Sequence, residues 1–423
     1  MDSCYNIEKF ESGKLEEISE LFESVYGRKY TLEYFDYILS NPPYGRDWKD
    51  FADEIEKEKK KKGSRYSAGI PRTNDSAMLF LQHIISKMYP KNSEKTSRAA
   101  IVFNGSPLFT GDAGSGESDI RKWLIDELDY LETIIALPKD LFYNTNISTY
   151  IWILTNKKSK ERKGKIQLIN AVDLCTRLRR GLSNKRNEIE DSHIEKIKSA
   201  YDSFKESKIS KIFENKESGY AKITVNRPLK RNYSFSNERI EMVKSRSVFT
   251  KLAESKKKGS AKKKEEEEGR KKQEEILSVL NSANKSKIYK VCNEFEKALT
   301  ELFDKSKVEI SNGLLKTIQH ALSEHDDSAT SCVKNGKAVY DSDLRDTEKI
   351  PLTEDIDEYF KHKVLPFVPD AVIDDSTRDK EGYEISVTKA FYEYKPLRSL
   401  DKIDSEIKNL QKEISKDLED LMD

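Results

Sequence analysis

The sequence predicts an α/β fold, in which a doubly wound sheet is followed by a mostly helical C-terminal region. Apolar runs rich in β-branched and aromatic residues are typical of buried strands, and they lie at residues 35–39, 98–103, 131–137 and 148–155. Between the first three runs, apolar residues recur at three- and four-residue steps, the period of a helix with one buried face. Strand, helix, strand, helix, strand, strand is the order of a doubly wound sheet that finishes in a hairpin.

The two helices are expected over Ser76–Met88, which follows a start signal at Asn74-Asp75, and over Ser118–Leu128. The second helix is preceded by the glycine-rich segment Thr110–Glu117. This segment lacks the Gly-Lys-Ser/Thr ending of a phosphate-binding loop. We therefore expect it to be a flexible connection rather than a nucleotide site.

The first apolar run ends in Asn41-Pro42-Pro43-Tyr44. Because proline cannot donate to a sheet ladder and forces its predecessor into an extended conformation, the strand must stop at Ser40 or Asn41. Open α/β sheets place their sites at the carboxyl ends of strands. The amide of Asn41 can accept a hydrogen bond from an amino group, and the ring of Tyr44 can stack on a base. The alternative is an ordinary turn at the end of a strand.

The chain resembles the modification subunit of type I restriction–modification systems, a family of adenine-specific DNA methyltransferases. The resemblance runs from about Tyr34 to the C-terminus. It rests on the segments SNPPYGRDWKD, AGIPRTNDSAMLFLQHIISKM, AAIVFNGSPLFTGDAGSGES, IIALPKDLFYNTNISTYIWILTN, LSNKRNEI, ITVNRPLK, VLPFVPDAVID and GYEISVTKAFYEYKPLRSLDKIDSEI. It implies transfer of a methyl group from S-adenosylmethionine to the exocyclic amine of adenine in DNA.

The resemblance makes Asn41, Pro42, Pro43 and Tyr44 the catalytic loop. The Asn41 side-chain oxygen and the Pro42 carbonyl would each accept one N–H of the amine, and Tyr44 would stack on the flipped base. An aromatic residue, Phe142 or Tyr143, would close the target-base pocket from the other side. Core packing of these two aromatics is the alternative.

Two cation-rich segments are candidates for contact with the DNA backbone. Lys57–Arg72 follows the catalytic loop, and Leu174–Asn187 holds the densest arginine cluster. The candidate residues are Lys60, Lys61, Lys62, Arg65, Arg72, Arg177, Arg179 and Arg180. The alternatives are a solvated helix end with a mobile loop for the first segment, and a surface facing another subunit for the second.

The chain differs from the resembled family at its N-terminus. The resembled enzymes carry a helical domain and a glycine-rich turn for S-adenosylmethionine ahead of the catalytic loop, whereas Met1–Lys29 offers only Gly13, Gly27 and a helix-like stretch at Leu15–Val25. We therefore expect a truncated sheet with no assignable cofactor-binding residues. The chain would need a separately encoded cofactor-binding half in trans. A non-catalytic, DNA-contacting assembly remnant and a truncated product without function are the alternatives.

Composition favours a cytoplasmic protein. Hydrophobic and charged residues each make up 36% of the 423 residues, which indicates exposed helices beside a modest core. There is no apolar run of membrane-spanning length and no signal sequence. Cys4, Cys175, Cys292 and Cys332 are widely scattered, which argues against a disulfide framework or a zinc site, and we expect no metal. The net charge of +1 leaves any DNA contact to local patches.

The expected segments are a leader at 1–33, half of a methyltransferase domain at 34–175, an extension at 176–252, a charged linker or single exposed helix at 253–275, a mainly helical region at 276–398 and a C-terminal heptad helix at 399–423. Short strands are expected near Ile223–Val225 and Tyr383–Tyr394. The heptad stripe consists of Leu400, Ile403, Ile407, Leu410, Ile414, Leu418 and Leu421. The resemblance implies that it docks on a specificity subunit, in a complex with a second modification subunit and a restriction subunit. An intramolecular helix pair is the alternative.

Overall fold

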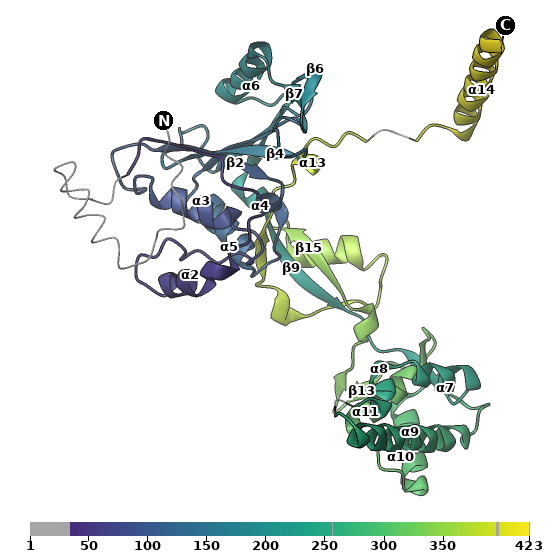
Figure 1. The fold of residues 1–423 in the computed structure, drawn as a ribbon. Helices are drawn as coiled ribbons and strands as arrows, with labels where there is room; N and C mark the ends of the chain where they lie inside the picture. Colours follow the sequence, from purple (N-terminus) through teal and green to yellow (C-terminus); the bar gives the residue numbers. More distant parts are fainter. Residues whose placement is uncertain (1–33, 256, 395–396, 423) are drawn as a thin grey trace. The chain divides into compact units, whose positions relative to one another are not determined.

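A computed structural model describes residues 34–255, 257–394 and 397–422, with side chains up to residue 415 (Figure 1). The chain divides into two compact units. The first runs to Gly219 and includes the segment from Gly382 onward, and the second is Tyr220–Glu381. This division does not coincide with the boundaries expected at 175, 252, 275 and 398. The expected leader at 1–33, with its helix-like stretch, lies outside the described residues.

The first unit is built on a six-stranded mixed sheet, in the order β1-β2-β4-β3-β5-β8. The strands are β1 (Tyr37–Ser40), β2 (Arg98–Asn104), β3 (Leu131–Ala136), β4 (Thr149–Thr155), β5 (Lys165–Asn170) and β8 (Ser210–Glu214). β1 runs parallel to β2 and β3 parallel to β5, while β4 is antiparallel to both of its neighbours. The doubly wound α/β sheet and its β3–β4 hairpin are thus confirmed, but the expectation that the hairpin finishes the sheet is wrong. The sequence did not reveal β5 and β8, and the sheet continues to Glu214.

Helices cover this sheet on both faces. The helices of the unit are α2 (Ala52–Lys59), α3 (Ala77–Ser86), α4 (Ser106–Phe109), α5 (Gly116–Lys122) with a π-helical turn at Trp123–Glu127, and α6 (Asp191–Ser203). Half-buried Ile151 and Ile153 of β4 pack in one apolar cluster with Ile197 of α6. Because side chains alternate along a strand, buried Trp152 points to the opposite face, where its ring meets that of Phe103 edge-on at 5.3 Å. Strand β3 is buried at every position, as expected for a central strand covered on both faces.

Strand β1 stands at one edge of the sheet. Within residues 34–422 it pairs only with β2. Two of its large apolar side chains are solvent-exposed, Tyr37 at 79% and Leu39 at 86%. An edge strand of this kind has unpaired backbone groups that can accept a further strand.

The rest of the first unit includes a hairpin of β6 (Thr176–Leu182) and β7 (Lys185–Glu188), and two C-terminal helices, α13 (Val387–Ala390) and α14 (Leu400–Met422). The expectation of a strand near Tyr383–Tyr394 is wrong for most of that segment. Only β17 (Glu381–Tyr383) is a strand, and α13 follows it after Ser386 caps the helix with its side chain. The helix expected at the heptad stripe is confirmed in α14.

The second unit combines a small antiparallel sheet with a helical cluster. β9 (Gly219–Asn226) contains the strand expected near Ile223–Val225 and pairs with β15 (Asp346–Pro351) and β16 (Val372–Ile373). The helices are α7 (Asn237–Lys244), α8 (Ser247–Thr250), α9 (Ser260–Asn281), α10 (Cys292–Ser306), α11 (Asn312–Ala321) and α12 (Ile356–Tyr359), and the remaining strands are β10 (Arg231–Ser234), β11 (Ile288–Tyr289), β12 (Ser323–His325), β13 (Val333–Lys334) and β14 (Lys337–Ala338). Phe295 is fully buried at the centre of the cluster, stacked on Tyr233 at 4.8 Å.

Two sequence expectations fail in this unit. The segment 253–275 is mostly helix, as one alternative held, but it is not wholly exposed. Gly269 of α9 is buried, and a Cβ there would lie 1.9 Å from the carbonyl oxygen of Leu252. Cys292 and Cys332 form a disulfide, contrary to the argument from scattered cysteines. The two are 40 residues apart, so only the fold brings them together.

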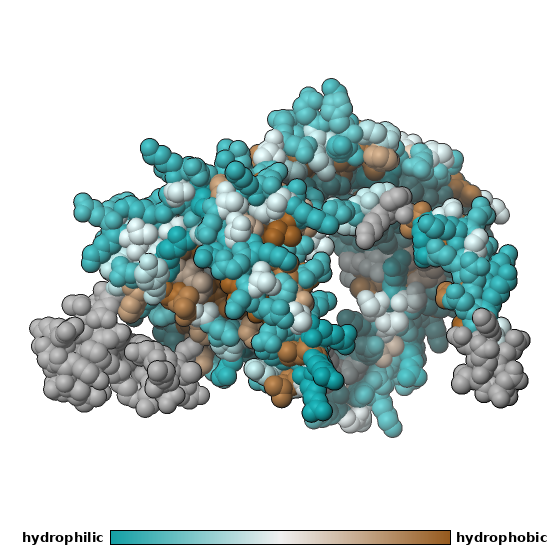
Figure 2. Space-filling view, turned by 90° about the horizontal axis from the view of Figure 1, so that it is seen from above, coloured by the Kyte–Doolittle hydropathy of each residue, from teal (hydrophilic) through white to brown (hydrophobic). Residues whose placement is uncertain are grey.

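Hydrophilic residues predominate on the face seen in Figure 2. Among the described residues there is no helix with the length and apolarity needed to cross a membrane. The same residues contain no cluster of three or more His, Cys, Asp or Glu side chains that could hold a metal ion.

Substitution of Gly116, the first residue of α5, is expected to destabilise the first unit. A Cβ at this position would lie 1.8 Å from the carbonyl oxygen of Ile70, so backbone must move. Overpacking of this kind costs about 1–3 kcal/mol, and urea unfolding of Gly116→Ala should show that loss. Gly105→Ala is the matched control, since its nearest neighbour would be a side-chain carbon at 3.6 Å. Equal unfolding midpoints for the two variants would contradict the close approach.

Candidate active site

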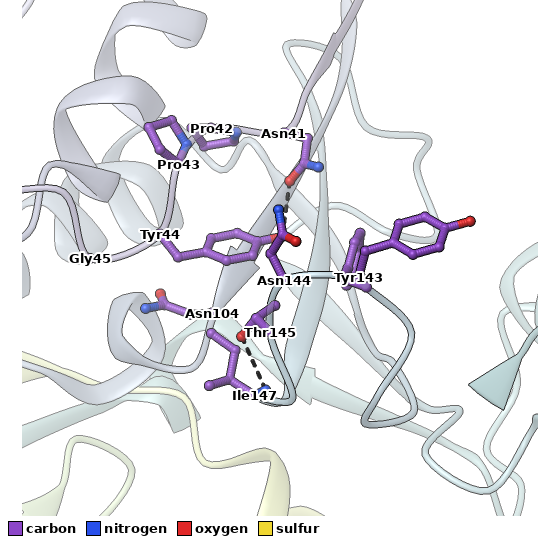
Figure 3. Close-up of a pocket in the computed structure, with 11 residues that line it drawn as sticks. Asn41, Pro42, Pro43, Tyr44, Gly45, Asn104, Tyr143, Asn144, Thr145 and Ile147 are labelled. Atoms are coloured by element: carbon purple, nitrogen blue, oxygen red, sulfur yellow. Dashed lines mark hydrogen bonds between the residues drawn. The ribbon is translucent and has the colours of Figure 1, made fainter. Parts of the chain in front are cut away.

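A pocket of about 600 Å³ lies at the carboxyl ends of β1 and β2. One wall is the loop after β1, and the other is the loop between β3 and β4 (Figure 3). The lining residues are Asn41, Pro42, Pro43, Tyr44, Gly45, Asn104, Phe142, Tyr143, Asn144, Thr145 and Ile147. Its size falls within the range of small-molecule sites. The structure therefore brings all four residues of the predicted catalytic loop together with both predicted aromatics.

The side chain of Asn41 is oriented by Tyr44. The Tyr44 hydroxyl donates a hydrogen bond of 2.9 Å to Asn41 Oδ1 (Figure 3). Burial raises the pKa of this hydroxyl, so Tyr44 stays protonated and remains a donor at neutral pH. An amide oxygen has two lone pairs, so Oδ1 can accept one further N–H. Asn41 itself is exposed, so a ligand can reach that second lone pair.

Contacts on both sides hold the loop after β1 in place. Pro42 is buried, and Gly45 completes the turn with a φ of 60°, which is accessible at low cost only to glycine. Beyond the turn, buried Trp48 donates its indole N–H to the carbonyl of Arg72 at 2.9 Å. The aromatic wall of the pocket is thus fixed relative to the sheet.

The two candidate aromatics of the β3–β4 loop behave differently. Phe142 is half-buried and lies edge-on to Tyr44, with ring centroids 6.4 Å apart. Tyr143 is 53% exposed and its ring points away from Asn41 and Tyr44 (Figure 3). Phe142 is therefore the aromatic that lies opposite the predicted catalytic loop.

The pocket also contains residues that the sequence did not single out. Asn104, the last residue of β2, has a buried Oδ1 with no hydrogen-bond partner among the described residues. Asn144, Thr145 and Ile147 come from the β3–β4 loop. The sequence signal for Asn104 is its position directly before Gly105, at the end of the apolar run 98–103. A buried amide oxygen without a partner is unfavourable unless a donor occupies the site.

The predicted DNA-backbone candidates fall into two groups. Lys60, Lys61 and Lys62 are exposed just after α2, and Arg177, Arg179 and Arg180 are exposed on β6. Arg65 and Arg72, in contrast, have internal carboxylate partners. Arg65 is bound to Glu58 at 2.6 Å, and Arg72 to Glu117, whose side chain is only 6% exposed, at 3.0 Å.

The glycine-rich segment Thr110–Glu117 connects α4 to α5, as expected. The side chain of Ser115 caps α5 by accepting from the Ser118 N–H. The carbonyls of Thr110 and Gly111 accept hydrogen bonds from the buried guanidinium of Arg121 at 2.8 and 3.2 Å. These carbonyl groups of the segment are thus used in hydrogen bonds within the protein.

A family model described as N-6 DNA Methylase matches residues 12–240, more than half of the 423 residues. The chain belongs to the N-6 DNA methylase family. The match begins ahead of Tyr34, within the segment we took as an unmatched leader. The sequence-based resemblance to type I modification subunits is confirmed by curated relatives with that name.

Two such relatives come from Methanocaldococcus jannaschii. The type I restriction enzyme MjaVIII methylase subunit is 34% identical over 171 residues, which cover 40% of this chain and 27% of the relative. The MjaIX methylase subunit is 27% identical over 216 residues, covering 50% and 35%. The chain thus spans about a quarter to a third of the length of these relatives. The solved type I methyltransferase subunit from Streptococcus thermophilus is 28% identical, with a TM-score of 0.36 over 44% of this chain and 35% of that one.

Acid is expected to destabilise the first unit through His83, which lies against Arg65. The Arg65 guanidinium is 2.7 Å from His83 Nδ1. Burial, followed by the charge of Arg65, lowers the pKa of His83 from 6.5 to about 4. Because the folded state holds its proton less tightly, stability is full above about pH 6.5 and falls by up to about 3 kcal/mol as the pH drops to 4.

Urea unfolding between pH 4 and 7 measures this effect. His83→Gln keeps an acceptor for Arg65 but cannot titrate, so its profile should be flatter over that window. An unaltered slope in His83→Gln would show that the acid sensitivity arises elsewhere.

Proposed function

We propose that this chain supplies the target-base site of an adenine-specific DNA methyltransferase in a type I restriction–modification system. The observation that carries the proposal is the pocket whose lining brings Asn41, Pro42 and Tyr44 together with residues of the β3–β4 loop. Membership of the N-6 DNA methylase family supports it. The names of the type I methylase relatives support assignment to a restriction–modification system.

The chemistry required at such a site is alignment of a weak nucleophile. The lone pair of adenine's exocyclic amine is delocalised into the ring. Asn41 Oδ1 and the Pro42 carbonyl can each accept one N–H, which draws the nitrogen towards tetrahedral geometry and directs its lone pair at the methyl donor. The same acceptors stabilise the positive charge that develops on nitrogen during transfer. In the described structure Tyr44 already holds Asn41 Oδ1 in place for this role.

The substrate base must leave the double helix to reach these acceptors. Extrusion of a base costs a few kcal/mol, and stacking of a base on an aromatic ring returns about 1–3 kcal/mol. Tyr44 provides the ring, and Phe142 forms the opposite wall. The unpartnered Oδ1 of Asn104 is a further polar group that contacts the base or the sugar of the extruded nucleotide.

The methyl donor by family is S-adenosylmethionine, which supplies the activated methyl group. The described residues do not fit it: among them, no glycine-rich turn with an acidic neighbour follows a strand, and the one glycine-rich segment is bound internally by Arg121. We therefore assign the described residues to binding of the base and its amine only. The donor would be held by strands that join the sheet at β1.

The edge of β1 has the properties that such strands require. Its outer backbone groups pair with none of the described residues, and Phe35, Tyr37 and Leu39 leave an apolar strip on one face, with exposures of 44%, 79% and 86%. Burial of each such side chain contributes about 1.5–3 kcal/mol. A cofactor-binding half in trans would add a strand to β1 and a helix over the strip. Asn41, at the end of β1, would then lie next to the cofactor.

The C-terminal helix offers a second docking surface. On α14, Leu400, Ile407, Leu410 and Ile414 recur with heptad spacing and are between 50% and 80% exposed. Such a seam favours packing against other helices. We assign it to a specificity subunit that reads the DNA sequence, within an assembly containing a second modification subunit and a restriction subunit.

Asn41→Ala is expected to abolish methyl transfer without weakening DNA binding. In a complex with a cofactor-binding half and a specificity subunit, loss of one aligned acceptor should lower the rate of methyl incorporation at least about 100-fold. Tyr44→Phe is the milder comparison, because it keeps the stacking ring and removes only the hydroxyl that orients Asn41, so the loss of rate should be smaller than in Asn41→Ala. Methyl incorporation and thermal melting are measured on the same preparations. Full methylation by a folded Asn41→Ala complex would rule out the catalytic assignment.

The isolated chain is expected to show no micromolar affinity for S-adenosylmethionine. The match to this chain covers 27% of the MjaVIII methylase subunit. When the chain is combined with the rest of that subunit, calorimetry should detect binding of S-adenosylmethionine. Leu39→Lys, at the end of the strip nearest Asn41, should prevent this recovery. Ile288→Lys, at a 62%-exposed side chain of the second unit, is the control and should not. Micromolar binding of S-adenosylmethionine by the isolated chain would refute the assignment of the cofactor to a separate half.

A further inference from the structure

The hairpin of β6 and β7 is a basic ribbon within the first unit. Residues 176–188 contain five cationic side chains and one acidic one, in a chain whose net charge is +1. Arg177, Arg179, Arg180 and Arg186 are all exposed. In the part of the chain that the structure describes, none of these four arginines forms an ion pair with a carboxylate. Unscreened arginines in this density attract a polyanion.

An irregularity in the ribbon determines where its arginines lie. The pairing register jumps between Arg177, opposite Asn187, and Leu182, opposite Lys185. The four residues 178–181 therefore lie opposite one residue of β7, Arg186, and form a bulge. Arg179 and Arg180 are part of this bulge. The Arg186 side chain crosses over Gly181, where a Cβ would lie 2.5 Å from its guanidinium. Bulges re-aim side chains and are frequent beside functional sites.

The ribbon is bound directly to the β3–β4 loop that forms one wall of the pocket. The Asp140 carbonyl accepts from the backbone N–H of Arg186 at 2.8 Å and from that of Asn187 at 3.1 Å. The Tyr143 carbonyl accepts from the Asn184 N–H at 3.1 Å. Two side-chain contacts reinforce these bonds. The Asn187 amide donates to the Lys139 carbonyl at 2.9 Å, and the Lys185 ammonium lies 5.4 Å from the centre of the Tyr143 ring.

We propose that the β6–β7 ribbon and residues 139–147 form one DNA-gripping element, in which the ribbon's arginines hold the DNA backbone beside the extruded base and the hydrogen bonds to the loop keep the far wall of the pocket closed on that base. The inference rests on the proposed function, because the ligand is double-stranded DNA. In this element, the DNA backbone is bound by Arg177, Arg179 and Arg180. Asn187 is a positioning residue, which acts through the loop.

Several features favour DNA over a protein partner. The ribbon adjoins the pocket wall, so a molecule that places a base in the pocket must run past it. Its exposed face is dominated by guanidinium groups, which match phosphate geometry. A protein-binding surface of similar size would instead carry an apolar centre. Leu182, 62% exposed at the tip, is the ribbon's single large exposed apolar side chain among the described residues.

The grip is tested by fluorescence anisotropy of the full chain with a double-stranded DNA oligonucleotide over a range of salt concentrations. Replacing Arg177, Arg179 and Arg180 together by Ala should weaken binding at least about tenfold and reduce the salt slope by about 0.9 for each phosphate that is no longer neutralised. The matched control replaces Lys196, Lys205 and Lys208, three exposed cations of the same unit, by Ala. Equal weakening in both variants, unchanged binding in the arginine variant, or no DNA binding by the unchanged chain at about 50 mM salt would each overturn the proposal.

The coupling to the pocket is tested with a second duplex that contains one unpaired adenine, which is already free to leave the stack. The unchanged chain should prefer this duplex to the fully paired one. Asn187→Ala should reduce the preference while leaving affinity for the paired duplex intact. Asn184→Ala is the control, because Asn184 contacts the loop through its backbone only. An unchanged preference in Asn187→Ala would overturn the coupling. Neither DNA-binding assay requires methyl transfer. Their outcome is therefore independent of the test of Asn41 as a catalytic residue, and either proposal can fail without the other.

Discussion

The double proline at the end of β1 is the constraint on which the rest of the site depends. Pro42 and Pro43 cannot extend the ladder with β2, so the strand ends at Ser40 and Asn41 emerges at the carboxyl edge of the sheet. The parallel pairing of β1 with β2 then sets Asn41 near the end of β2, where Asn104 lies in the same pocket. The antiparallel β3–β4 hairpin brings its loop to that edge and supplies Phe142. Four strands and two loops thus converge on one amide group.

The open edge of β1 and the pocket are consequences of the same arrangement. In a doubly wound sheet, sites form where neighbouring strands end, and a strand at the edge has only half of its neighbours. Asn41 lines the pocket together with Phe142, and the exposed side chains of Tyr37 and Leu39 precede it on the edge strand. The division of labour follows from this geometry. In the proposed function, the described residues hold the base, and the methyl donor lies on the far side of β1.

Much of the architecture could be predicted because it depends on local patterns. Apolar runs located β1 to β4, and the Asn-Pro-Pro-Tyr segment located one wall of the pocket. β5 and β8 were missed because both are short runs that contain polar residues, such as Gln167 in the middle of Lys165–Asn170. Asn104, Asn144 and the Cys292–Cys332 disulfide depend on tertiary contacts that carry no spacing signal. For Arg65 and Arg72, the charge pattern was visible, but their carboxylate partners were identified only by the fold.

The most direct test of the central claim is to locate the extruded base by crosslinking. A duplex with 5-iodouracil in place of the target adenine is bound by the reconstituted complex and irradiated, and the attached peptide is identified by mass spectrometry. Our account predicts attachment at Tyr44, with loss of the crosslink in Tyr44→Ala. Attachment at the exposed ring of Tyr143, or at residues outside the pocket, would contradict it.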